Sequence, residues 1–221
     1  MTQQIALPSD TPAYRSTPAD GRATSRGVVV APDIGGLRPL FDDLCQTLAD
    51  EHAWSVCAPE PWPGRESLTL EERLASVGTL ADGDVLGDLT AAADATGHDQ
   101  VGIIGFCMGG MYALKASATG RFDRVAAFYG MIRVPERWQS EHHREPLDAV
   151  RADGASPVLA VIGTADEWTP VDDVDALEDA GAEVVRYAGA RHGFVHDPSR
   201  DDHRADYAAD AWRRVVTWLG G

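Results

Sequence analysis

The chain has 221 residues, of which 44% are apolar and 24% charged, as in ordinary globular proteins. This length predicts one domain with enough chain to bury a substantial core. The 35 acidic residues outnumber the 19 basic ones, which leaves a formal net charge of −16. Such a charge repels nucleic-acid phosphates and anionic membrane surfaces, so we expect neither nucleic acid nor a membrane as a partner.

The sequence also bears on location and redox state. No stretch approaches the roughly 18 consecutive apolar residues of a membrane span, and residues 1–26 lack the apolar core of a signal peptide. Cys45, Cys57 and Cys107 form no CxxC pair, and their odd number does not suit a disulfide framework. We therefore expect a cytoplasmic protein, with Cys45 and Cys57 in its core.

From residue 27 onward, short β-branched runs alternate with amphipathic segments. Continuous apolar runs predict buried strands at 27–31, 54–57, 101–104, 125–129, 158–162 and 184–187. Apolar residues at helical spacing predict helices near 37–48, 85–93, 111–119, 171–180 and 208–219. The alternation predicts a single α/β domain over residues 27–221, with a mostly parallel sheet and helices on both faces. We expect residues 1–26 to form an irregular segment or edge strands.

The segment 133–156 is the one long connection without clear periodicity. Connections of this length often serve as lids or binding loops. This one contains Trp138 and the adjacent residues Glu141, His142 and His143. Because neighbouring side chains on a loop rarely converge on one metal ion, we interpret this triplet as part of a solvated loop and predict no metal site.

The strongest chemical signal is Gly-Phe-Cys-Met-Gly-Gly at 105–110, directly after the predicted strand 101–104. It matches the G-x-nucleophile-x-G turn between a strand and a helix, with Cys107 in the nucleophile position. The turn exposes the sulfur, and the start of the following helix favours a negative charge there. We predict that Cys107 is a reactive thiolate. The alternative is a buried cysteine in a glycine-rich turn.

A nucleophile of this kind requires a histidine that moves its proton and an acid that orients the histidine. Asp166 lies just past the predicted strand 158–162, and His192 lies just past the strand 184–187. In open α/β sheets, functional side chains gather beyond the carboxyl ends of the strands. The order nucleophile, acid, histidine is that of α/β-hydrolases. Taken alone, Asp166 could cap the next helix and His192 could be a solvated loop residue.

These segments resemble the dienelactone hydrolase family of α/β-hydrolases, from about residue 28 to the C-terminus. The matching segments are 105–110, 126–130, 157–159 with Asp166, 192–194 and 207–212. The resemblance implies hydrolysis of a small ester or lactone, with Cys107 as nucleophile, His192 as base and Asp166 as orienting acid. The predicted reaction requires no cofactor. We expect a monomer or a homodimer.

The resemblance also implies an acidic side chain, usually glutamate, that holds the resting thiol and helps to deprotonate it. Asp33 stands at this position with a side chain one methylene shorter, and the alternative for it is a helix N-cap. The oxyanion hole would consist of the backbone N–H groups of Ile34 and Met108.

The family binds a substrate carboxylate with two arginines. Arg65 is the nearest match for one of them, and His196 stands where the other would lie. A neutral histidine cannot replace a bidentate guanidinium, so the carboxylate site is at best half preserved. We expect Trp62, Trp138 and Phe194 either to line an apolar substrate pocket or to pack as ordinary loop residues.

A competing interpretation is a non-hydrolytic thiol protein on the same fold, either a redox sensor or a small-molecule binding module. The departures at Asp33 and His196 favour this alternative, whereas the complete set of cysteine, histidine and aspartate favours the enzyme. We predict the hydrolase.

Overall fold

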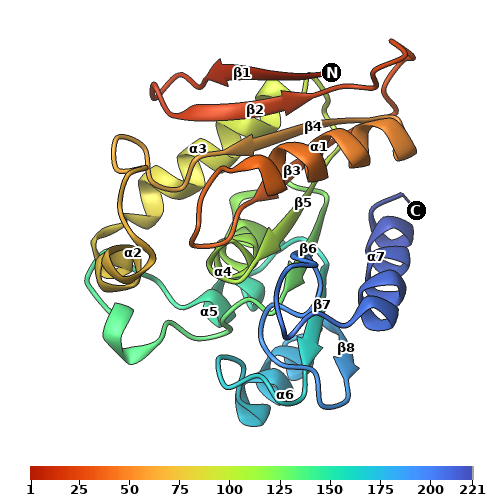
Figure 1. Ribbon diagram of the computed structural model, residues 1–221. Coiled ribbons are helices and arrows are strands. Elements are labelled where there is room, and N and C mark those ends of the chain that lie inside the picture. The colour runs from red at the N-terminus through yellow and green to blue at the C-terminus, as the bar shows by residue number, and fades with distance from the viewer. Residues whose placement is uncertain (221) are drawn as a thin grey trace.

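A computed structural model describes residues 1–220 of the chain (Figure 1). Its strands are β1 (Thr2–Ala6), β2 (Pro12–Ser16), β3 (Arg26–Ala31), β4 (Trp54–Pro59), β5 (Val101–Phe106), β6 (Arg124–Phe128), β7 (Val158–Gly163) and β8 (Glu183–Tyr187). They form one sheet in the order β1-β2-β4-β3-β5-β6-β7-β8. The pairs from β4 to β8 are parallel, whereas β2 pairs antiparallel with both β1 and β4. The prediction of a mostly parallel α/β sheet is confirmed.

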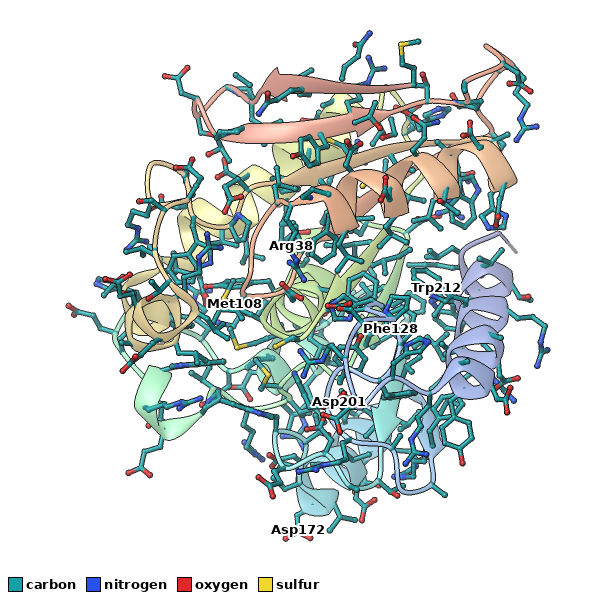
Figure 2. All side chains as sticks on the ribbon, viewed as in Figure 1. Arg38, Met108, Phe128, Asp172, Asp201 and Trp212 are labelled. Carbon is teal, nitrogen blue, oxygen red and sulfur yellow. The ribbon has the colours of Figure 1, made fainter. Side chains whose placement is uncertain are left out.

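The helices are α1 (Pro39–His52), α2 (Leu70–Ser76), α3 (Asp82–Ala95), α4 (Met108–Ala116), α5 (Pro146–Val150), α6 (Val171–Asp179) and α7 (Ala205–Gly220). Short 3-10 helices are η1 (Val77–Thr79), η2 (Ser117–Thr119) and η3 (Glu136–Trp138). Helices α3 to α6 contribute to one apolar core, whereas α1 and α7 contribute to a second core on the opposite face. In the second core Phe128 of β6 packs on Trp212 of α7, with ring centroids 5.1 Å apart (Figure 2). Both faces of the parallel strands are therefore covered, which explains their continuous apolar runs.

The N-terminal hairpin lies along one edge of the sheet in Figure 1, where β1 and β2 extend it beyond β4. Each strand predicted from residue 27 onward is present, with bounds within two residues of those expected. Helix α1 begins at Pro39 rather than at residue 37 because proline suits the first helical position. Helix α2 was not expected, although Thr69 and Glu72 form a capping box that is visible in the sequence. Within residues 1–220, no helix is long and apolar enough to span a membrane.

In the segment 133–156, the expectation of a solvated triplet holds for Glu141 and His142, which are exposed, and is wrong for His143. The His143 side chain is fully buried. Its Nδ1 accepts a hydrogen bond from Lys115 Nζ at 3.1 Å, and its Nε2 donates to the carbonyl oxygen of Val77 at 3.0 Å. Lys115 also pairs with Asp82 at 2.6 Å. Burial and the neighbouring ammonium lower the pKa of His143, because a second positive charge is unfavourable there.

Candidate active site

Cys107 occupies the turn between β5 and α4. Its backbone has φ 55° and ψ −118°, a strained conformation for a residue with a side chain, with a cost of about 1–3 kcal/mol. The flanking glycines allow this turn: a Cβ on Gly105 would lie 2.1 Å from the carbonyl oxygen of Gly109, and a Cβ on Gly109 would lie 2.1 Å from that of Ala31. The Cys107 side chain remains partly exposed. Strain of this kind persists only where surrounding structure imposes it, and it is typical of active sites.

Two backbone donors lie next to this turn. Met108 is the first residue of α4, where helical N–H groups lack partners within the helix. Ile34 follows β3, and its carbonyl oxygen accepts a hydrogen bond from Trp62 Nε1 at 2.9 Å, which holds the loop in place. Within the part of the chain that the structure describes, neither the Ile34 nor the Met108 N–H donates to another protein group. Both donors are therefore free to bind an oxygen atom.

His192 and Asp166 meet as the sequence predicts. His192 Nδ1 donates to Asp166 Oδ2 at 2.8 Å, and Asp166 Oδ1 accepts from the backbone N–H of Trp168 at 2.9 Å. Among residues 1–220, no group forms a hydrogen bond of normal geometry with the buried Nε2 of His192. Burial by itself would lower the pKa of His192, but interactions with Asp166 and with the adjacent Cys107 side chain raise it to about 10. The imidazole is thus held with Nε2 free for the sulfur or for a substrate.

The raised pKa of His192 predicts how stability varies with pH. A group whose pKa is higher in the folded chain stabilises the fold fully below its ordinary value of 6.5, and this contribution is lost as pH rises through the folded value of about 10. We expect the free energy of unfolding to fall more over this range in the wild-type protein than in Asp166→Asn, which lacks the carboxylate. Urea unfolding across this pH range measures the difference, and parallel pH profiles would contradict the prediction.

Asp33 has different partners from the expected thiol. Its carboxylate accepts hydrogen bonds from both Nη atoms of Arg38, at 2.7 and 2.8 Å, and from His196 Nε2 at 2.7 Å. Burial alone would raise the pKa of Asp33, but His196 and Arg38 lower it far below its ordinary value. Across residues 1–220, none of the Asp33 hydrogen bonds reaches Cys107. Asp33 is not an N-cap either, because the residue that precedes α1 is Arg38.

Tyr129 connects this network to the histidine, and the sequence analysis missed it. Its hydroxyl is hydrogen-bonded to His196 Nδ1, and its ring lies edge-on to that of His192 with centroids 5.2 Å apart. Its φ of 40° is rare for a residue with a bulky side chain. Its sequence signals are its place at the end of a buried strand and within the segment 126–130 that resembles the family, and neither identifies it as a site residue. The hydrogen-bonded pair of His196 and Asp33 therefore supports His192 through the Tyr129 ring.

Trp168 and Trp138 form a second aromatic group near His192, which we call the aromatic wall. Trp168 lies 6.0 Å from the His192 ring and stacks on Trp138 at 5.2 Å, measured between ring centroids. The guanidinium of Arg137 lies 4.6 Å from the centroid of the Trp168 ring. Trp138 itself is buried and donates from Nε1 to the Leu74 carbonyl oxygen at 2.9 Å. Trp168 is two residues from Asp166, so its proximity could have been expected from the triad prediction.

Comparison with known proteins assigns the chain to a family. The model described as "Dienelactone hydrolase family" matches residues 11–221. The chain belongs to the dienelactone hydrolase family. This result confirms the resemblance, and it confirms the prediction of a hydrolase at the level of the family.

Relatives in the dienelactone hydrolase family match over most of the chain. A Methylorubrum extorquens protein, provisionally assigned as a carboxymethylenebutenolidase, is 32% identical over 94% of this chain and 76% of its own. The carboxymethylenebutenolidase of Rhodococcus opacus is 27% identical over 98% of this chain and 89% of its own. The crystal structure of a provisionally assigned dienelactone hydrolase from Klebsiella pneumoniae superposes with a TM-score of 0.87, at 28% identity, over 100% of this chain and 98% of that one.

Two of the aromatic residues singled out in the sequence lie behind the active site of this dienelactone hydrolase family member. Trp62 and Phe194 are both fully buried. Trp62 packs beneath the Ile34 loop, and the Phe194 ring packs between Tyr129 and Tyr187, with centroids 5.7 and 5.3 Å away. Both residues therefore pack against other protein groups, which is the second of the two interpretations that the sequence left open for them. They support the loops of the site and do not line a substrate surface.

Arg65 lies in the segment between β4 and α2, next to Trp62. Its guanidinium is 5.2 Å from the centroid of the Trp62 ring, and Nη1 donates to Thr79 Oγ1 at 3.1 Å. It borders a cavity of about 250 Å³ whose wall includes Met108 but not Cys107. Arg65 is therefore near the site without touching the nucleophile.

The groups around Cys107 are of the kinds that acyl transfer uses: a thiol, a histidine, a carboxylate bonded to that histidine and two free backbone N–H donors. Over the described residues, no group of three or more His, Cys, Asp or Glu side chains could hold a metal ion. The chemistry that these protein groups support is nucleophilic attack on a carbonyl carbon.

Proposed function

We propose that this protein hydrolyses small esters or lactones, with Cys107 as the nucleophile, His192 as the base and Asp166 as the acid that orients it. One observation carries the proposal. His192 is held through Nδ1 by Asp166 at 2.8 Å, which leaves its buried Nε2 free beside the cysteine of the strained turn. A histidine that merely filled space would not need its second nitrogen buried without a partner.

In the first half of the reaction, the Cys107 thiolate attacks the ester carbonyl carbon and a C–S bond forms. The carbonyl π electrons move to the oxygen, where the N–H groups of Ile34 and Met108 stabilise the negative charge. A preorganised donor of this kind contributes about 2.7–4 kcal/mol at the transition state. When the tetrahedral intermediate collapses, the C–O bond breaks and the imidazolium of His192 gives its proton to the departing alkoxide.

In the second half, neutral His192 removes a proton from water, and the resulting hydroxide attacks the thioester carbonyl carbon. The C–S bond breaks, so that the acid product leaves and the Cys107 thiolate and the His192 imidazolium are restored. Asp166 keeps Nε2 directed at the reacting atoms in both halves. In a lactone the leaving alcohol stays tethered to the acyl group, so a single product results.

Asp33 does not move the thiol proton in this scheme. Its carboxylate is occupied by Arg38 and His196, so the proton of the resting thiol passes to His192 alone. The carboxylate contact that the family resemblance implies rests on Arg65 only, because His196 is buried and already bonded to Asp33 and Tyr129. We therefore place ester or lactone hydrolysis ahead of any one named lactone.

Acyl-enzyme trapping tests this proposal. Rapid mixing with p-nitrophenyl acetate is expected to give a burst of p-nitrophenol that matches the enzyme concentration, and quenched samples are expected to carry one acetyl group on Cys107 by peptide mass spectrometry. The Cys107→Ala protein should show neither, whereas Cys45→Ala should keep both because Cys45 is fully buried. Turnover by Cys107→Ala, or an acetyl group on another residue, would reject the assignment.

A further inference from the structure

A cavity of about 250 Å³ lies on one side of Cys107. We propose that it is the acyl pocket of the enzyme and that it receives an extended, uncharged acyl group. This inference rests on the proposed function and deepens it by naming the substrate class. Pockets that enclose a whole ligand usually measure about 300–1,000 Å³, so this cavity suits one part of a substrate.

The strand order places the cavity on the acyl side of the reaction. Its walls include Ala31 and Pro59, the last residues of β3 and β4. Strand β5, which precedes Cys107, has β3 and β4 on one side, whereas β7 and β8, which precede the loops of Asp166 and His192, lie on the other. The cavity and the catalytic histidine therefore lie on opposite sides of the nucleophile.

Ester geometry then determines which part of the substrate faces the cavity. The leaving oxygen must lie near His192 Nε2 to receive its proton. The carbonyl oxygen must point to the N–H groups of Ile34 and Met108, so the acyl group extends away from His192. Met108 belongs both to this oxyanion site and to the wall of the cavity. In the proposed complex, an acyl chain attached at Cys107 extends past Met108 into the cavity.

The walls of the cavity are mostly apolar. The apolar side chains that line it include Pro32, Pro61, Pro63, Leu80, Val85 and Leu89. Proline and aliphatic surfaces of this kind gain free energy when they bury methylene groups, which corresponds to about a fourfold gain in binding for each one. We therefore expect longer acyl chains to react faster until the cavity is filled.

The charged groups of the cavity disfavour an anionic chain. Three carboxylates line it, those of Glu60, Asp84 and Asp88, against one guanidinium, that of Arg65. Asp88 is held by the hydroxyl group of Thr11 at 2.7 Å, so its charge is fixed beside the cavity. Because like charges repel, a carboxylate at the end of the acyl chain would lower the reaction rate.

The test compares kcat/KM for the p-nitrophenyl esters of acetate, butyrate and hexanoate and for the p-nitrophenyl half-ester of glutarate. We expect a rise of about fourfold for each methylene group and a slower reaction of the half-ester than of butyrate. In Val85→Phe the hexanoate-to-acetate ratio should fall by about tenfold or more, because the phenyl ring occupies the cavity. Leu86→Phe is the matched control: Leu86 is the next residue of α3, is also half-buried and lines a different cavity, so the ratio should be retained.

The outcomes separate the acyl pocket from the proposed function. A ratio unchanged by Val85→Phe, or a half-ester that reacts faster than butyrate, would overturn the pocket while ester hydrolysis stands. If no ester is turned over, the proposed function fails, and alkylation of Cys107 still tests the pocket. N-hexyl iodoacetamide should then label Cys107 faster than iodoacetamide does, by mass spectrometry, and Val85→Phe but not Leu86→Phe should remove the advantage. Equal labelling rates would overturn the pocket.

Discussion

The His192→Ala substitution is expected to lower kcat/KM for p-nitrophenyl acetate by about 10³- to 10⁴-fold. Two functions are lost together: the stabilisation of the thiolate by the imidazolium, and the proton transfers to the leaving group and from water. Proton transfer by a positioned side chain commonly contributes about 10²- to 10⁴-fold. Asp166→Asn should cause a smaller loss than His192→Ala, because the imidazole remains although its orientation is weakened.

A double substitution makes this prediction sharper. Residues that act as one unit have non-additive effects, so Cys107→Ala with His192→Ala should be no slower than Cys107→Ala alone. His142→Ala is the matched control, since His142 is exposed in the 133–156 segment and should leave the rate unchanged. Additive losses in the double variant, or full activity in His192→Ala, would show that this histidine does not act with Cys107.

The Gly109→Ala substitution is expected to have the largest effect on stability. Its Cβ would lie 2.1 Å from the carbonyl oxygen of Ala31 and 2.3 Å from that of Pro32, and neither backbone atom can move as a side chain would. The first turn of α4 must therefore separate from the end of β3. We expect a loss of about 4 kcal/mol in the free energy of unfolding, which corresponds to a fall of about 10 °C in Tm for a chain of this size. Thermal unfolding followed by circular dichroism measures it.

Gly87→Ala provides the matched control for this experiment. Gly87 also lies within a helix, but a Cβ there would meet no atom within 4 Å. Alanine is the better helix former, so this variant should be more stable than the wild type by about 0.5–1 kcal/mol. A Gly109→Ala protein with wild-type stability would mean that the turn and β3 are not in close contact.

Local patterns of residues determine much of the fold. Continuous apolar runs identify the parallel strands because both faces of those strands are covered. The glycine spacing around Cys107 identifies the nucleophile turn because all of its steric requirements fall within a few residues. Asp166 and His192 can be placed from chain order alone, because the carboxyl ends of parallel strands share one edge.

Other features depend on contacts between distant parts of the chain. Asp33 bonds to His196, 163 residues away, and no local pattern distinguishes this partner from the expected thiol. His143 has the local sequence of an exposed loop residue, yet its side chain is buried and accepts a hydrogen bond from Lys115 of α4. Trp62 is an aromatic residue in a loop and could line a pocket, but it is buried beneath the Ile34 loop.

The amino-acid sequence alone therefore determined the architecture and the chain order of the proposed nucleophile, acid and histidine, because periodicity and short motifs encode them within single elements. The tertiary structure alone decided which side chains surround that set: the aromatic wall at Trp168, the support through Tyr129 and the cavity beside Met108. These features depend on how helices and loops pack against one another. Such packing brings together residues that are far apart in the sequence, so no local pattern predicts it.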